Sequence, residues 1–156
     1  MSGERRFSVV DPRLSKTGGE ILASAIQHSA DQGNSMATIE SLFYALVNHK
    51  KVTPVARLVG IDPDSLGLTY GTRPDPNGAA MLWDGEVQTA INVAHRSAQD
   101  RGAKRAGLVD LLAYTTKHEA VKDIFAFTPD KQRDLMRLNA VLLQSQQPYR
   151  LQRLAG

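Results

Sequence analysis

The strongest constraint on the fold of this chain is an internal duplication in its sequence. An Ala-rich apolar stretch, a glycine, a second apolar stretch and a Pro-Asp turn occur in residues 21–66 and recur in that order in residues 87–135. The matching pairs share one constant spacing, which we call the repeat offset, and they are Gly33 and Gly102, Leu42 and Leu111, and His49 and His118. A repeat of this length indicates a duplicated supersecondary unit.

The size and composition of the chain indicate an ordinary folded protein. Its 156 residues are 42% hydrophobic and 22% charged, which is typical of a globular domain and not of a disordered segment. The absence of cysteine excludes a disulfide scaffold and a cysteine nucleophile, and it suits a reducing compartment. No apolar run approaches the ~20 residues that span a bilayer. We therefore expect a soluble, cytoplasmic protein.

The spacing of the apolar residues predicts helices almost throughout. Positions that follow the i, i+3, i+4 rhythm are Ile21, Leu22, Ala25 and Ile26 in the first copy and Val87, Ile91, Ala94 and Ala98 in the second. The second helix of each copy is expected to start after Thr38 and near Gly107. The fold class is therefore all-α.

Capping signals divide this pattern into about eight helices, four in each copy. Three pairs place a capping side chain before a proline at the first helical position, namely Thr53-Pro54, Asp62-Pro63 and Thr128-Pro129. Asp84 precedes the long helix of the second copy and can cap it in the same way.

The duplication separates two repeats and a linker. We place repeat one at residues 14–71, the linker at residues 72–83 and repeat two at residues 84–143. The linker is rich in Gly, Pro, Asp and Asn, and it contains no GxxxxGK(S/T) motif for binding phosphate. The terminal segments, residues 1–13 and 144–156, lack strong periodicity, and we expect them to be flexible.

One stretch of repeat one has a distinctive order of residues. Ala37-Thr38-Ile39-Glu40-Ser41 precedes the apolar run Leu42-Phe43-Tyr44-Ala45-Leu46-Val47. This stretch resembles the Thr-Glu-His motif and Leu-rich helix in the N-terminal domain of the Clp AAA+ unfoldases. The resemblance covers about residues 14–143, and it depends on the order and duplication of short motifs.

The resemblance implies a fold and a role. It implies two four-helix repeats related by a pseudo-twofold axis, and a binding module that recruits substrates and adaptor proteins to a Clp ATPase. The chain has no Walker A sequence, so we expect either a stand-alone protein of this fold or the first domain of a longer one. A stand-alone copy can also compete with the ATPase's own domain for ligands.

The two copies differ at the acid of the family motif. In the Gram-positive type of this family, the Glu of each repeat can hold the guanidinium of a phosphorylated arginine. Repeat one keeps this acid as Glu40, with Ser41 in place of the His, whereas repeat two has Val109 at the matching position. Valine cannot pair with a guanidinium, so we expect the second site to be lost. Asp110, one position on, should face elsewhere because successive helical residues differ by about 100°.

Aromatic and apolar residues near the linker suggest where a partner docks. Trp83 lies beside the linker and is less easily placed in a core than the other aromatic residues. We hypothesise a groove between the two repeats that is edged by Phe7, Leu82 and Trp83 and binds a peptide or adaptor. Together with Glu40, these are the candidate partner-binding residues.

The sequence contains no pattern that indicates catalysis or a cofactor. The four histidines, which are His28, His49, His95 and His118, lack the spacing and the supporting carboxylates of a metal site. We interpret the matching pair, His49 and His118, as helix-end residues near unpaired carbonyl groups. We therefore expect no enzyme activity, no metal and no small-molecule cofactor.

The charge leaves one alternative open. The net charge is +3, and basic residues gather at Arg96, Arg101, Lys104 and Arg105 and again at Arg150 and Arg153. Clustered cations on one face are typical of nucleic-acid-binding proteins. The alternative function is thus a small helical nucleic-acid-binding regulator, although we expect protein partners and no membrane.

Overall fold

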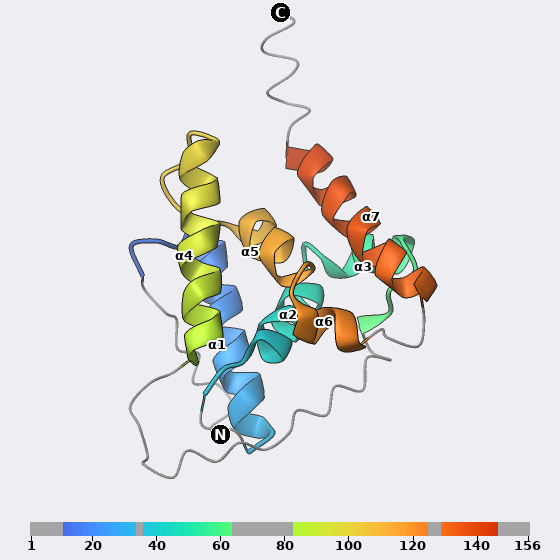
Figure 1. Ribbon diagram of the computed structural model, residues 1–156, viewed down its shortest axis with the longest axis horizontal. Helices are drawn as coiled ribbons and strands as arrows, with labels where there is room; N and C mark the ends of the chain where they lie inside the picture. Colours follow the sequence, from blue (N-terminus) through green and yellow to red (C-terminus); the bar gives the residue numbers. More distant parts are fainter. Residues whose placement is uncertain (1–10, 34–35, 64–82, 125–128, 147–156) are drawn as a thin grey trace, which may run out of the picture.

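The chain folds into helices in a computed structural model that describes residues 11–33, 36–63, 83–124 and 129–146 (Figure 1). Seven α-helices lie in these ranges: α1 (Lys16–Asp31), α2 (Ile39–Val47), α3 (Thr53–Leu58), α4 (Gly85–Asp100), α5 (Leu108–Thr115), α6 (Glu119–Ile124) and α7 (Pro129–Gln146). The described ranges contain no strand, so the all-α prediction is confirmed. The eighth helix, expected to begin at Pro63, falls largely outside the described residues.

The two long helices, α1 and α4, both begin with a side-chain cap. Ser15 Oγ accepts the Gly18 N–H at 3.1 Å, and Asp84 Oδ1 accepts the Val87 N–H at 2.9 Å. Each bond satisfies a backbone donor that has no partner inside its helix. The two caps are separated by the repeat offset, and the capping role predicted for Asp84 is confirmed.

Both long helices also end alike. Gly33 and Gly102 follow α1 and α4, and each has a φ of 84°. Residues with a Cβ rarely adopt this left-handed conformation, which explains why a glycine ends both helices.

The shorter helices α2 and α5 start where the sequence predicts. Thr38 and Ser41 form a reciprocal capping box, with Thr38 N–H donating to Ser41 Oγ at 2.8 Å and Ser41 N–H donating to Thr38 Oγ1 at 3.2 Å. At α5 only half of this box is possible, because Gly107 has no side chain. The Gly107 N–H donates to Asp110 Oδ2 at 3.0 Å.

The role predicted for Thr53 is wrong. Helix α3 begins at Thr53 itself, and no side chain caps it. The Thr53 hydroxyl donates instead to the Val47 carbonyl at 2.7 Å. The end of α2 leaves carbonyl groups without helical partners, and the Thr53 hydroxyl satisfies one of them.

Two isolated backbone bridges, both parallel, tie the two parts of the chain together. One joins Leu14 to Ala106 and the other joins Ala37 to Trp83. The repeat offset relates Leu14 to Trp83, and it also relates Ala37 to Ala106. In the first bridge, Ser15 N–H donates to the Ala106 carbonyl and Ala106 N–H donates to the Arg13 carbonyl, both at 2.8 Å. In the second bridge, Asp84 N–H donates to the Ala37 carbonyl at 3.0 Å.

The buried side chains form one hydrophobic core shared by both parts. Helix α1 packs on α2, α4 packs on α5, and α2 and α5 contact each other. Helix α7 closes the core against α3 and α5, and Figure 1 shows α5 lying between α4 and α7. Fully buried residues include Phe43, Leu46, Leu111, Leu112, Leu135 and Leu138. Within the described ranges, no helix has the length and apolarity needed to cross a membrane.

Residues before the first helix are also held in place. Asp11 and Arg13 form an ion pair of 2.7 Å, and Arg13 Nη1 donates to Asn92 Oδ1 on α4 at 2.6 Å. The hydrogen bond from the Arg13 side chain lowers the pKa of Asp11, against a smaller opposing effect of burial. These contacts join the start of the first copy to the middle of α4.

Candidate binding surface

Glu40, the acid of the motif singled out in the sequence, lies in the first turn of α2 and is half-buried. Its neighbour Ser41 is fully buried in the capping box, so Ser41 has a structural role. Val109, which matches Glu40 in the second copy, is buried in the core. The second copy therefore offers no carboxylate at the motif position.

Asp110 already binds a guanidinium that belongs to the chain itself. Arg101 Nη2 lies 2.6 Å from Asp110 Oδ2, and Arg101 Nε lies 3.1 Å from Asp110 Oδ1. Such bidentate pairs are strong and directional. The Asp110 side chain is 3% exposed and the Arg101 side chain is 39% exposed, so the carboxylate is the buried partner. The sequence analysis did not predict this pair. The signal for it is that the second copy has Asp110 where the first has Ser41, and Arg101 where the first has Gln32.

Trp83 is half-buried at the start of the second copy. It forms the bridge with Ala37, packs against the core, and donates its indole N–H to Gln88 Oε1 at 2.7 Å. Phe7 and Leu82 lie outside the described residues, so the structure does not describe the groove predicted between these three side chains. The structure brings Trp83 to Ala37, which shortly precedes Glu40 in the chain.

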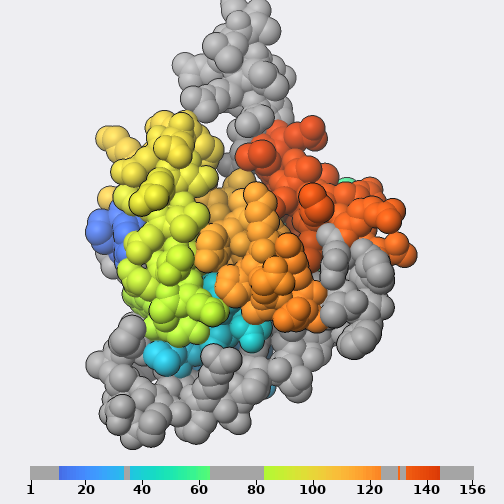
Figure 2. Space-filling model, viewed as in Figure 1, coloured from blue at the N-terminus to red at the C-terminus, as the bar shows by residue number. Residues whose placement is uncertain are grey.

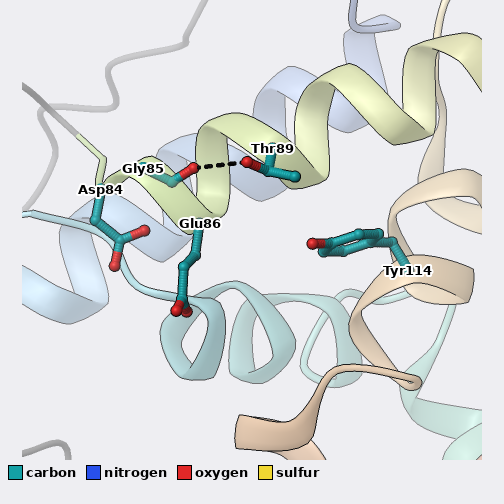
Figure 3. Close-up of a pocket in the computed structure, with 5 residues that line it drawn as sticks. All are labelled: Asp84, Gly85, Glu86, Thr89 and Tyr114. Carbon is teal, nitrogen blue, oxygen red and sulfur yellow. Dashed lines mark hydrogen bonds between the residues drawn. The ribbon is translucent and has the colours of Figure 1, made fainter.

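A shallow hollow opens directly after Trp83, where the start of α4 faces α5 (Figure 3). It has a volume of about 540 Å³ and is lined by Asp84, Gly85, Glu86, Thr89 and Tyr114. The Tyr114 phenol extends from α5 toward α4, and the Thr89 hydroxyl donates to the Gly85 carbonyl at 3.0 Å. Asp84 is occupied as the cap of α4, so this end of the hollow is mostly structural.

A separate groove lies between α4 and α5. It has a volume of about 510 Å³, and Tyr114 lines both the groove and the hollow. Val93, which lies in the lining of the groove, is 44% exposed. The remaining lining residues are Ala94, Ser97, Asp110, Ala113, Lys117, His118 and Glu119. Figure 2 shows this face, where α4 meets the segment that carries α5 and α6.

The matching histidines follow the ends of α2 and α5, as the sequence predicts. Nδ1 accepts the backbone N–H of Lys51 at 3.2 Å in His49 and that of Ala120 at 3.1 Å in His118. Nε2 faces a carboxylate, Glu20 at 3.9 Å from His49 and Glu86 at 3.5 Å from His118. His49 thus accepts a backbone N–H from the segment before α3, and His118 accepts one from the first turn of α6. The proximity of the two rings to unpaired carbonyl groups stays a prediction. Burial lowers the pKa of His49, and Glu20 opposes this effect.

Two other sequence hypotheses concern metal and nucleic acid. Within the described ranges, no group of three or more His, Cys, Asp or Glu side chains is arranged to hold a metal ion. In the basic cluster, Arg96, Lys104 and Arg105 are exposed, whereas Arg101 is engaged with Asp110.

Comparison with known proteins finds no family model and no curated relative for the chain. The likeness to the Clp N-terminal domain therefore depends on the motif around Glu40 and on the duplication.

Proposed function

We propose that this chain is a non-enzymatic protein-binding module that resembles the N-terminal domain of the Clp ATPases. It recruits substrates or adaptors to a Clp unfoldase–protease system in the cytoplasm, or it competes with the ATPase's own N-terminal domain for them. Its architecture in this proposal is two four-helix repeats related by a pseudo-twofold axis.

The reciprocal backbone bridges are the observation that carries this proposal. Leu14 contacts Ala106, and their counterparts in the other copy, Trp83 and Ala37, contact each other. A twofold operation on a duplicated unit produces this exchange of partners. The matching caps of α1 and α4 support the same relation, and a double helical repeat is the architecture that the Clp resemblance implies.

The surface between α4 and α5 supports a binding role over a catalytic one. Its charged groups are largely engaged with each other: Asp110 with Arg101, and His118 with Glu86. The groove combines apolar lining residues such as Val93 and Ala113 with polar and charged ones, and such a mixed surface suits polypeptide recognition.

One member of the basic cluster weakens the nucleic-acid alternative. The Arg101 guanidinium donates from both Nε and Nη2 to Asp110, so it is poorly placed to neutralise a phosphate. A nucleic-acid binder would still show a steep loss of affinity with rising salt.

A degradation assay tests the proposal. The chain is added to the source organism's Clp ATPase and protease with fluorescent casein as the unfolded client, and casein cleavage and co-purification with the ATPase are measured. An adaptor increases cleavage and co-purifies with the ATPase. A competitor decreases cleavage and binds casein directly. A chain that leaves casein cleavage unchanged and binds neither the ATPase nor casein contradicts the proposal. Salt-sensitive binding to duplex DNA in place of protein binding favours the alternative.

A further inference from the structure

The turn between α2 and α3 is organised around one histidine. The His49 carbonyl accepts the N–H groups of Val52 at 2.8 Å and of Thr53 at 2.9 Å. The Nδ1 atom of the same residue accepts the Lys51 N–H at 3.2 Å. His49 therefore holds three successive backbone donors of the segment that leads into α3, two of them directly through its carbonyl and one through its ring.

The bond to the ring requires a neutral imidazole. A ring nitrogen accepts a hydrogen bond only while it carries no proton, so the proton of the neutral His49 ring lies on Nε2. Protonation of the ring places a second N–H group at Nδ1, opposite the Lys51 N–H. Two donors cannot bond to each other, so the turn loses this contact.

The surroundings of His49 oppose its protonation. The side chain is 12% exposed, and burial lowers the pKa of the ring. Glu20 on α1 raises this pKa from 3.9 Å, but its side chain is 50% exposed, so water screens the attraction. Lys51 and Lys50, in the same turn, lower the pKa further. A protonated ring is thus poorly accommodated while the turn is closed.

The matching histidine of the second copy has a different charge environment. Nδ1 of His118 also accepts a backbone N–H. Its Nε2 lies closer to a carboxylate, 3.5 Å from Glu86 on α4, and it stands between Lys117 and Glu119 in the chain. Two lysines follow His49 instead. Because acidic groups compensate a charge on His118, the second copy provides an internal control for the first.

The helix that follows His49 depends on its neighbours. Helix α3 has six residues and no side-chain cap, and it packs on α7 of the second copy (Figure 1). A helix this short is not stable on its own in water. Ala56, Val59 and the following Ile61 are buried. Loss of the turn that leads into α3 therefore frees the helix from α7 and exposes these apolar side chains.

We propose that His49 is an acid-sensitive latch that holds α3 against α7 while its ring is neutral. Protonation breaks the bond from Lys51 to the ring and releases α3, while the helices of the second copy stay in place. The change exposes a buried apolar surface in response to acid. The latch does not depend on the proposed protein-binding function.

Native-state hydrogen exchange followed by NMR tests the latch. Protection factors are measured at about pH 7.5 and about pH 5.5, on either side of the ordinary histidine pKa of about 6.5. We expect those of the Ala56, Val59 and Ile61 amides to fall about three- to tenfold in acid, the loss typical of one hydrogen bond. Amides at the start of α6 should keep their protection. Long-range ¹H–¹⁵N correlation should place the proton of the neutral His49 ring on Nε2.

A variant that cannot titrate isolates the latch. Asparagine accepts the N–H two residues on without binding a proton, so His49→Asn should keep α3 equally protected at both pH values. His118→Asn makes the same change in the second copy and should leave the loss in α3 intact, as should His28→Gln. If His49→Asn fails to fold, His49→Asp replaces it, because its carboxylate accepts the same N–H and stays charged at both pH values.

Several results overturn the latch. One is protection of α3 that acid does not change, and another is a loss that α6 shares equally. A third is a loss in α3 that persists in His49→Asn or His49→Asp. A proton on Nδ1 of the neutral ring also contradicts it. Casein binding and cleavage at neutral pH test the proposed function separately, so either idea can fail while the other stands.

Discussion

The two copies have the same helix caps, helix ends and backbone bridges, but their side chains differ. The first copy is described over residues 14–63 and the second over residues 83–146. Matching caps begin α1 and α4, matching glycines end them, and the two bridges exchange equivalent residues. Between the helices, the first copy holds the stack of His28 on Tyr44, and the second copy has a groove lined by Ser97 and Ala113. A duplicated scaffold can thus keep its backbone contacts while the side chains between its helices diverge.

The prediction with the largest expected effect on stability tests whether the two copies share one core. Phe43 and its counterpart Leu112 are both fully buried. Phe43→Ala should lower the free energy of unfolding by about 3–5 kcal/mol and Leu112→Ala by about 2–5 kcal/mol, because each leaves a cavity. Urea unfolding followed by far-UV circular dichroism and by fluorescence of the single tryptophan, Trp83, should give coincident transitions for both variants. Transitions that separate would show that the copies unfold independently.

The next effect concerns the ion pair that only the second copy has. Arg101→Gln should cost about 2 kcal/mol of stability, because it leaves the buried Asp110 carboxylate without its cation. Asp110→Ser should cost less, about 1 kcal/mol, because serine still accepts the Gly107 N–H and Arg101 can reach water. Arg96→Gln is the matched control, since Arg96 is exposed on α4, which Arg101 directly follows, and its effect should stay within about 0.5 kcal/mol. Equal losses for the three variants in urea unfolding would contradict this order.

A third comparison sets Gly18 against Gly85. A Cβ added at Gly18 would lie 2.9 Å from the Ala106 carbonyl oxygen, whereas a Cβ added at Gly85 meets nothing within 4 Å. Gly18→Ala should destabilise by about 1 kcal/mol, because the steric strain exceeds the gain in helix propensity. Gly85→Ala should be neutral or stabilise slightly. Thermal unfolding checks both, and a stabilised Gly18→Ala would mean that the first bridge can move.

The smallest effect is a dependence of stability on pH that comes from the first copy. Burial lowers the pKa of His28 and of His49 below the usual 6.5. Below that pH the unfolded chain binds more protons than the folded one, so stability should fall as pH drops from about 7.5 to about 5. The contribution of Asp11 has the usual carboxylate sign: it is present above about pH 4 and is lost at lower pH.

Substitution of the histidines isolates this effect. His28→Gln combined with His49→Gln should flatten the dependence of the urea midpoint on pH in that window. Lys104→Gln, on the exposed loop after α4, should leave the dependence unchanged. An unchanged slope in the double histidine variant would contradict the assignment to these two rings.

Local signals in the sequence predicted the helices well, and the reason is that caps act within one turn. Thr38 and Asp84 begin helices where predicted, because each accepts a backbone N–H from the adjoining turn, and Gly107 begins α5 with its own N–H bonded to the Asp110 carboxylate. Thr53 does not cap α3 as predicted, because its hydroxyl donates back across a turn to the Val47 carbonyl. That contact depends on the turn between α2 and α3, which no local pattern specifies.

The candidate site was predicted less well, because its residues come from separate helices. Comparing the copies predicted that Val109 removes the acid present at Glu40, and that difference can be seen in the sequence alone. The ion pair of Arg101 with Asp110 and the exposure of Val93 depend on how α4 packs against α5. Phe7 and Leu82, two of the four predicted binding residues, lie outside the described residues.

The sequence by itself determined the all-α class, the duplication and the loss of the Glu40 acid in the second copy, which has Val109 there. These follow from periodicity, capping and identity at matched positions, which are properties of the chain read in order. Only the tertiary structure decided that Arg101 of the same chain neutralises Asp110 and that the space between α4 and α5 stays open. The physical reason is that both depend on the distance between side chains on different helices, and packing sets that distance.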